Sequence, residues 1–148
     1  MIRILGALSI VALGATMVLA QNLAPIKERQ EIMKKINDET KLLTAMAKGE
    51  APFDAAKMSA TLTPWDAAGK KYVTLFPDDS KTGEKTRAKA EIWQNKADFE
   101  AKMTDFLKVV GTVKVATTAD AFKAGYANLG KACDNCHEKY RAPRDRAS

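Results

Sequence analysis

The stretch FKAGYANLGKACDNCHEKYR, from Phe122 to Arg141, contains the clearest structural signal in the sequence. Its apolar and aromatic residues recur at spacings of three and four, which is the period of one face of an α-helix. Either Thr117 or Thr118 can cap the start of this helix, because a threonine hydroxyl accepts from N–H groups of the first turn. We therefore expect an amphipathic helix that ends near Arg141. Its inner face should contain Phe122, Tyr126, Leu129, Cys133, Cys136 and Tyr140.

Within this stretch, Cys133-Asp134-Asn135-Cys136-His137 has the pattern C-x-x-C-H. Positions three apart share a helix face, so two thiols at this spacing can add to the two vinyl groups of one haem. His137 then reaches the iron from the same side. The chain contains two cysteines and one histidine, and all three fall within these five residues. The sequence therefore predicts one covalently attached haem c, with His137 as an iron ligand.

Other uses of Cys133 and Cys136 are weaker. A structural zinc ion takes four ligands, and this segment offers three. A thiol–disulfide redox motif normally lies in a βαβ context, for which the sequence shows no pattern. A disulfide between the two cysteines would close a loop too short to stabilise the fold much. Haem attachment stays the prediction.

Three more helical segments precede this one, at about 25–48, 54–75 and 90–114. Gly at 49 should end the first, and Pro64 should bend or split the second. The polar, turn-rich linker 76–83 is the longest connection. Four amphipathic helices joined mostly by short connections should pack side by side. The predicted fold class is all-α, an antiparallel up-down-up-down four-helix bundle.

Residues 1–20 have the pattern of a secretory signal peptide, with Arg3, an apolar run and small residues up to Ala20. An uncleaved membrane anchor is the alternative. The remaining residues, 21–148, suit one domain, and no other segment could cross a membrane. The net charge of +6 is dispersed, and without a basic stripe or motif it does not indicate nucleic-acid binding. We expect an exported, periplasmic protein.

The sixth position on the iron, opposite His137, is the next question. In an up-down-up-down bundle the end of helix four lies beside the start of helix one. At 1.5 Å per residue, His137 lies roughly 6 Å from its helix end and Met33 about 12 Å from its helix start, so their heights are similar. Met103 is a weaker contender at about 18 Å, while Met46 and Met58 are roughly 25–30 Å away. Met33 is predicted to ligate the iron, and simple packing over an open haem face is the alternative.

Two arginines lie at the haem end of the predicted bundle. Arg29 is one turn before Met33, and Arg141 is one turn after His137. Either guanidinium could bind a haem propionate through two parallel hydrogen bonds. The alternative for both is an ordinary solvated arginine at a helix end.

With these motifs in place, the chain resembles the class II c-type cytochromes, a family that includes the cytochromes c′. The resemblance covers residues 23–141. The C-terminal haem motif is its most specific feature, because class I cytochromes have theirs near the N-terminus. Proline is frequent in the family where this chain has Ala90. The matching stretches are RQEIM (29–33), AKGE (47–50), EKTRAKAEIW (84–93) and GKACDNCHEKYR (130–141).

The resemblance implies haem on the fourth helix, Met33 on the distal side of the iron, and Arg29 and Arg141 near the propionates. It leaves two functions open. One is a low-spin electron carrier with His137/Met33 iron, which the KGE stretch favours, and the other is a five-coordinate, high-spin protein that binds nitric oxide or carbon monoxide. An electron carrier would need a redox partner protein, and membrane respiratory or photosynthetic complexes are the candidates. Relatives often form homodimers through the first two helices, and a monomer is the alternative. An enzyme is not expected, since no second histidine exists for distal acid–base chemistry.

Overall fold

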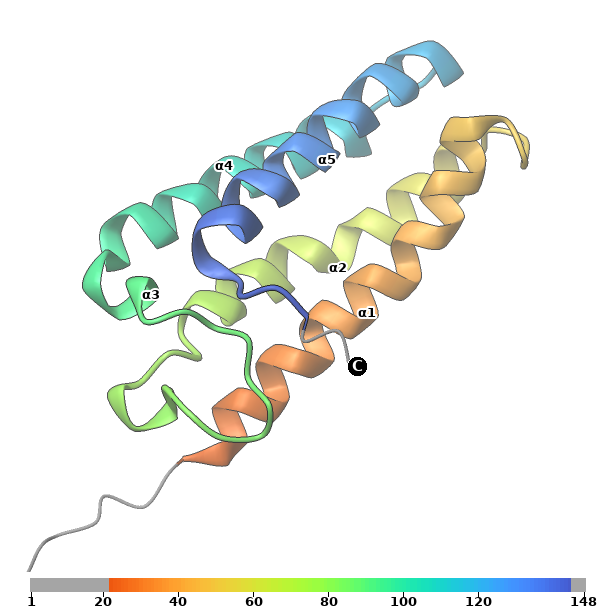
Figure 1. The fold of residues 1–148 in the computed structure, drawn as a ribbon. Helices are drawn as coiled ribbons and strands as arrows, with labels where there is room; N and C mark the ends of the chain where they lie inside the picture. The colour runs from red at the N-terminus through yellow and green to blue at the C-terminus, as the bar shows by residue number, and fades with distance from the viewer. Residues whose placement is uncertain (1–21, 145–148) are drawn as a thin grey trace, which may run out of the picture.

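The computed structural model describes residues 22–144, so the expected signal peptide lies outside the described residues. The predicted all-α bundle is confirmed (Figure 1). None of the described helices is long and apolar enough to span a membrane. The helical elements are α1 (Leu23–Lys48), α2 (Ala55–Val73), the 3-10 turn η1 (Asp78–Ser80), α3 (Glu91–Gln94), α4 (Lys96–Lys114) and α5 (Ala119–Tyr140).

The four long helices form two antiparallel pairs, α1 with α2 and α4 with α5 (Figure 1). The pairs are joined mainly where α2 packs on α4, and α1 also contacts α5. The core between them is apolar and aromatic, as the spacing of three and four requires. Its most deeply buried members are Ile26, Leu43, Met58, Leu62, Trp65, Val113, Phe122 and Leu129.

Local signals explain most helix ends. Gly49 adopts a left-handed conformation with φ of 77°, and its N–H donates to the carbonyl oxygens of Ala45 and Met46, which ends α1. The side chain of Asp54 accepts from the Lys57 N–H at 2.9 Å and caps α2. Each terminus therefore satisfies backbone groups that the helix itself leaves unpaired.

The helices are continuous at one expected break and interrupted where one helix was expected. Pro64 does not split α2, which runs unbroken past it, and the buried side chains of Leu62 and Trp65 on either side hold the helix against the core. The segment predicted as one helix over 90–114 is instead divided at Asn95. The Asn95 side-chain amide donates to the Glu91 carbonyl oxygen at 3.2 Å, while the backbone carbonyl oxygen of Asn95 accepts from the Phe99 N–H. Asparagine competes with the helix in this way because its short amide bonds locally to the backbone.

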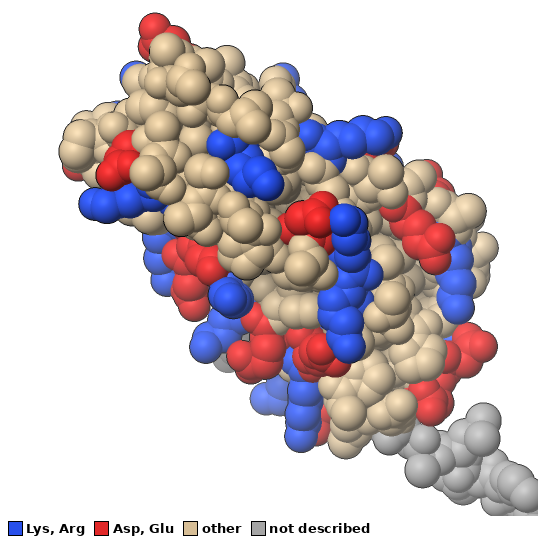
Figure 2. All heavy atoms as spheres, turned by 180° about the vertical axis from the view of Figure 1, so that it is seen from behind, with Lys and Arg blue, Asp and Glu red and all other residues tan. Residues whose placement is uncertain are grey.

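The surface carries interspersed charges of both signs, as Figure 2 shows for the face seen from behind. Several are ion pairs within one helix, such as Lys70–Asp66 at 2.6 Å. Exposed pairs of this kind contribute little to stability. The charged side chains on this face are therefore ordinary solvated residues of both signs, and they do not form a single basic stripe.

The cap of α5 allows a direct test. The structure selects Thr118 over Thr117, because the Thr118 hydroxyl accepts from Ala121 N–H at 3.3 Å. We expect Thr118→Ala to lower the free energy of unfolding by about 1 kcal/mol. The adjacent control, Thr117→Ala, should change it by less than about 0.5 kcal/mol. Urea unfolding followed by circular dichroism measures both, and equal losses would contradict the assignment.

Candidate haem site

A mostly apolar cavity lies between the helices at one end of the bundle. Four of the six residues predicted to bind the cofactor or the iron line it, namely Met33 from α1 and Cys133, Cys136 and His137 from α5. The structure thus brings together side chains that are about a hundred residues apart in sequence. The other lining residues are Ile32, Ile36, Gly69, Tyr72, Lys102, Met103, Phe106 and Ala132.

The two cysteines are free, half-buried thiols on the inner side of α5. Burial, together with the nearby Asp134 carboxylate, raises the pKa of Cys133 to about 11. Burial likewise raises the pKa of Cys136. A thiol–disulfide exchange centre needs the opposite, a thiol with a depressed pKa. The environment therefore disfavours the redox-dithiol alternative and suits thiols that are consumed in thioether bonds.

His137 is held in the last turn of α5, where its carbonyl oxygen accepts from the Arg141 N–H at 3.0 Å. Burial lowers the pKa of His137 to about 4, and the positive charges of Arg141 and Arg87 act in the same direction. The imidazole is therefore neutral at physiological pH. A neutral ring is the form that can ligate a metal.

The methionines fall into two groups, one at the cavity and one elsewhere in the core, as their heights along the helices predict. Met33 and Met103 both line the cavity, from α1 and α4, whereas Met46 and Met58 are buried elsewhere in the core. Met33 shares α1 with Ile32 and Ile36, which also line the cavity. Ligation of the iron by Met33 stays a prediction.

The lining fits a haem c. A pair of thiols for thioether bonds, a neutral imidazole and a thioether face one apolar space, and this donor set matches covalent His/Met haem. Gly69 contributes in a way that the sequence did not indicate. A Cβ there would lie 2.8 Å from Leu107 Cδ2 and 2.9 Å from Met103 Sδ, so glycine permits the close approach of α2 to α4 beside the cavity.

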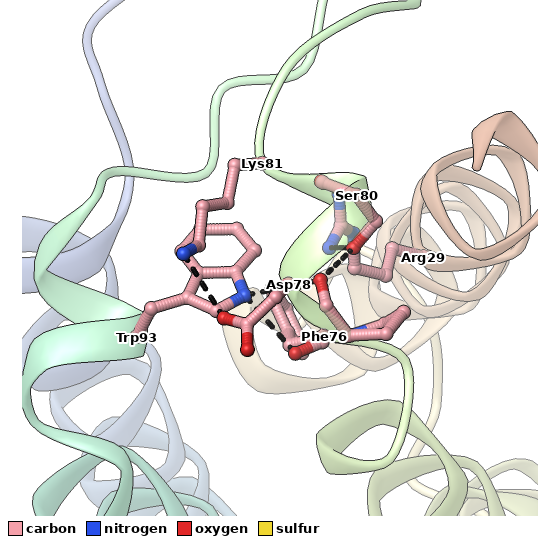
Figure 3. Close-up of polar contacts among 7 residues, drawn as sticks. Arg29, Phe76, Asp78, Ser80, Lys81 and Trp93 are labelled. Atoms are coloured by element: carbon pink, nitrogen blue, oxygen red, sulfur yellow. Dashed lines mark hydrogen bonds and ion pairs between the residues drawn. The ribbon is translucent and has the colours of Figure 1, made fainter. Parts of the chain in front are cut away.

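Arg29 has different partners from those expected. It is only 3% exposed, and its guanidinium donates to the Leu75 carbonyl at 2.9 Å, the Ser80 carbonyl at 3.0 Å and the Ser80 hydroxyl at 3.2 Å (Figure 3). It also stacks 4.3 Å from the centre of the Phe76 ring. The alternative of a solvated arginine is therefore wrong. Arg29 holds the loop after α2 against α1, and its contact with a propionate stays a prediction.

The loop that Arg29 holds is further ordered by Trp93, whose indole N–H donates to the Phe76 carbonyl at 3.0 Å (Figure 3). The Phe76 and Trp93 rings meet edge to face at 5.6 Å. Sequence reasoning missed this cluster, because no local pattern predicts which loop a helical arginine will reach.

Arg141 is exposed at the end of α5, in an extended conformation, and it forms a short antiparallel bridge with Ala88. Its charge is close enough to the cavity to lower the pKa of His137. Arg87, from the segment paired with it, acts in the same direction and was not singled out from the sequence. The predicted contact between Arg141 and a propionate stays a prediction.

Comparisons with known proteins find similar chains in one family. The family model described as cytochrome C′ matches residues 24–141. The chain is 36% identical to cytochrome c-556 of Rhodopseudomonas palustris, covering 87% of this chain and 89% of that protein. It is 35% identical to cytochrome c′ of the same organism, covering 97% and 98%. The solved structure of Rhodopseudomonas palustris cytochrome c′ superimposes with a TM-score of 0.78, at 33% identity, over 82% of this chain and 98% of that one.

The role of Arg29 can be tested by Arg29→Met, which keeps an unbranched apolar stem and removes the guanidinium. The buried oxygens of Leu75 and Ser80 would lose their donor, so we expect the free energy of unfolding to fall by about 2–4 kcal/mol. Lys27→Met is the matched control, since Lys27 is exposed on the same helix and makes a 3.5 Å ion pair with Glu84. The Lys27→Met substitution should change the free energy of unfolding by less than about 0.5 kcal/mol. Equal effects in urea unfolding would contradict the role given to Arg29.

Proposed function

Because this chain belongs to the cytochrome c′ family, we propose that it is a periplasmic electron carrier whose haem iron has His137 and Met33 as its axial ligands. Proteins of this family contain covalently bound haem c. The observation on which the proposal rests is that Met33 of α1 and His137 of α5 line one cavity together with the two attachment cysteines.

Each protein group has a distinct task in this proposal. Cys133 and Cys136 hold the macrocycle by thioether bonds and so keep it on one face of α5. The neutral His137 and Met33 would hold the iron as its ligands. The haem supplies a one-electron couple. His/Met ligation raises its potential and, with both axial positions filled, nothing has to bind or leave during electron transfer.

The walls of the cavity support the same task. Ile32, Ile36 and Phe106 line it with carbon, which limits access of water to the iron. The polarity and burial of such a shell tune the redox potential of a metal centre. A mostly apolar lining of this kind suits an electron carrier.

Gas binding is the second candidate. Met33 is only half-buried, and methionine is a flexible residue that often fills gaps without bonding to anything. The chain is also nearly equally identical to a cytochrome c′ and to a cytochrome c-556, so identity does not favour either. With Met33 as a packing residue, the iron would be five-coordinate and could bind nitric oxide or carbon monoxide.

The remaining parts of the proposal concern the cellular setting. A non-enzymatic role is favoured because His137, the one histidine of the chain, lines the cavity with the attachment cysteines, and no second imidazole is available for acid–base chemistry. The partner would be a redox protein, such as a membrane respiratory or photosynthetic complex. Export is proposed from the pattern of residues 1–20. A homodimer through α1 and α2 and a monomer are both compatible with the proposal.

The axial ligand is tested by the far-red absorption band of the ferric protein, which arises from a methionine–iron bond. We expect the wild-type protein to show this band and Met33→Ala to lose it, because alanine has no sulfur to reach the iron. Met103→Ala is the matched control, since Met103 lines the same cavity from α4. It should retain the band.

Loss of the band in Met103→Ala but not in Met33→Ala would transfer the ligand role to α4. A wild-type spectrum without the band would favour the gas-binding candidate.

A further inference from the structure

The segment that follows η1 runs from the start of α1 to the end of α5 before it enters α3 (Figure 1). On the α1 side, the Gln30 amide donates to the Glu84 carbonyl at 2.8 Å. On the α5 side, Ala142 N–H donates to the Arg87 carbonyl at 2.8 Å, and Lys89 N–H donates to the Tyr140 carbonyl at 3.0 Å. The segment therefore closes the haem end of the bundle.

The backbone of this segment is strained immediately before Arg87. Gly83, Glu84 and Lys85 all have positive φ angles, of 107°, 48° and 52°. Glycine adopts such angles readily, but Glu84 and Lys85 are residues for which they are uncommon. Strain of this kind persists only where the surrounding contacts impose it. The turn redirects the chain from α1 to α5, and Arg87 is the second residue after it.

Arg87 is fixed where the segment meets α5. Its Nε–H donates to the Ala142 carbonyl oxygen at 2.9 Å, so its side chain and its backbone both bond to the same residue. Ala142 directly follows Arg141, whose N–H donates to the His137 carbonyl. A half-buried guanidinium is thereby held at the C-terminal end of α5, the end that contains His137.

We propose that Arg87 is a positioning residue for the redox couple, a fixed cation that stabilises the reduced state of the iron bound by His137. The inference rests on the proposed haem site and does not depend on the identity of the sixth ligand. When the iron gains one electron from a redox partner, the charge of the site falls by one, and Arg87 itself is unchanged. A cation held nearby interacts better with the less positive, ferrous site.

The side chain of Arg87 suits the role of a fixed charge. Arginine retains its charge at any pH that proteins experience, and its planar fork bonds in a fixed direction. The two hydrogen bonds to Ala142 restrain the position of this charge relative to the end of α5.

The test is the midpoint potential of the holoprotein, with Arg87→Gln and Arg87→Met as two neutral variants with different stems. We expect each variant to lower the ferrous-to-ferric ratio at a fixed ambient potential about threefold. For a one-electron couple this corresponds to a midpoint potential lower by about 28 mV. Arg87→Lys should retain most of the wild-type potential because it keeps the charge. Lys123→Gln is the control, with the same change in net charge on the exposed surface of α5, about 21 Å from His137 along the helix.

The inference is overturned if the midpoint potentials of the two neutral variants equal that of Lys123→Gln. It is also overturned if the potential of Arg87→Lys falls as far as theirs, since the charge would then not be the cause. The spin state of the wild-type iron is recorded in the same samples. A high-spin spectrum would sink the proposed Met33 ligand and leave the Arg87 comparison intact.

Discussion

Attachment of a rigid, planar haem to one face of one helix is the constraint on which the rest of this structure depends. The spacing Cys133-x-x-Cys136-His137 sets both thiols and the imidazole on the inner side of α5, in its last turns. Every other element must then leave an apolar space there. Gly69 allows α2 to approach α4 closely beside this space, and α1 forms its opposite wall with Met33. Burial in turn lowers the pKa of His137 and so keeps its imidazole neutral.

The haem end of the bundle is held together by contacts that connect segments far apart in sequence. Arg29 fastens the loop after α2 to α1 through three hydrogen bonds and the Phe76 ring. The following segment is then paired with the end of α5 at Ala88 and Arg141. The far end is joined more simply, by a 2.7 Å hydrogen bond between the Thr44 and Tyr126 hydroxyls. The cavity therefore lies between two sets of contacts that fix α1 relative to α5.

Much of this could be predicted from the sequence, because helix periodicity and the C-x-x-C-H spacing are local signals. Counting residues along the helices was enough to select Met33 over Met46 and Met58 as a cavity residue. The break at Asn95 was missed because the propensity of a single asparagine is a weak signal beside the apolar spacing that continues on both sides of it. The positions of Arg29 and Arg87 depend on where a long loop returns, which is set by tertiary packing. The membership of the chain in the cytochrome c′ family agrees with the local signals and adds nothing about these loop contacts.

Occupancy of the sixth position distinguishes a carrier from a gas-binding protein, and carbon monoxide reports it most directly. The measurement is a titration of the ferrous holoprotein with carbon monoxide, followed at the Soret band at neutral pH. With Met33 on the iron, the spectrum should be low-spin and should not respond to carbon monoxide at concentrations that saturate an open haem. A rapid, stoichiometric shift of the band would show that the sixth position is free and would contradict the proposed electron carrier.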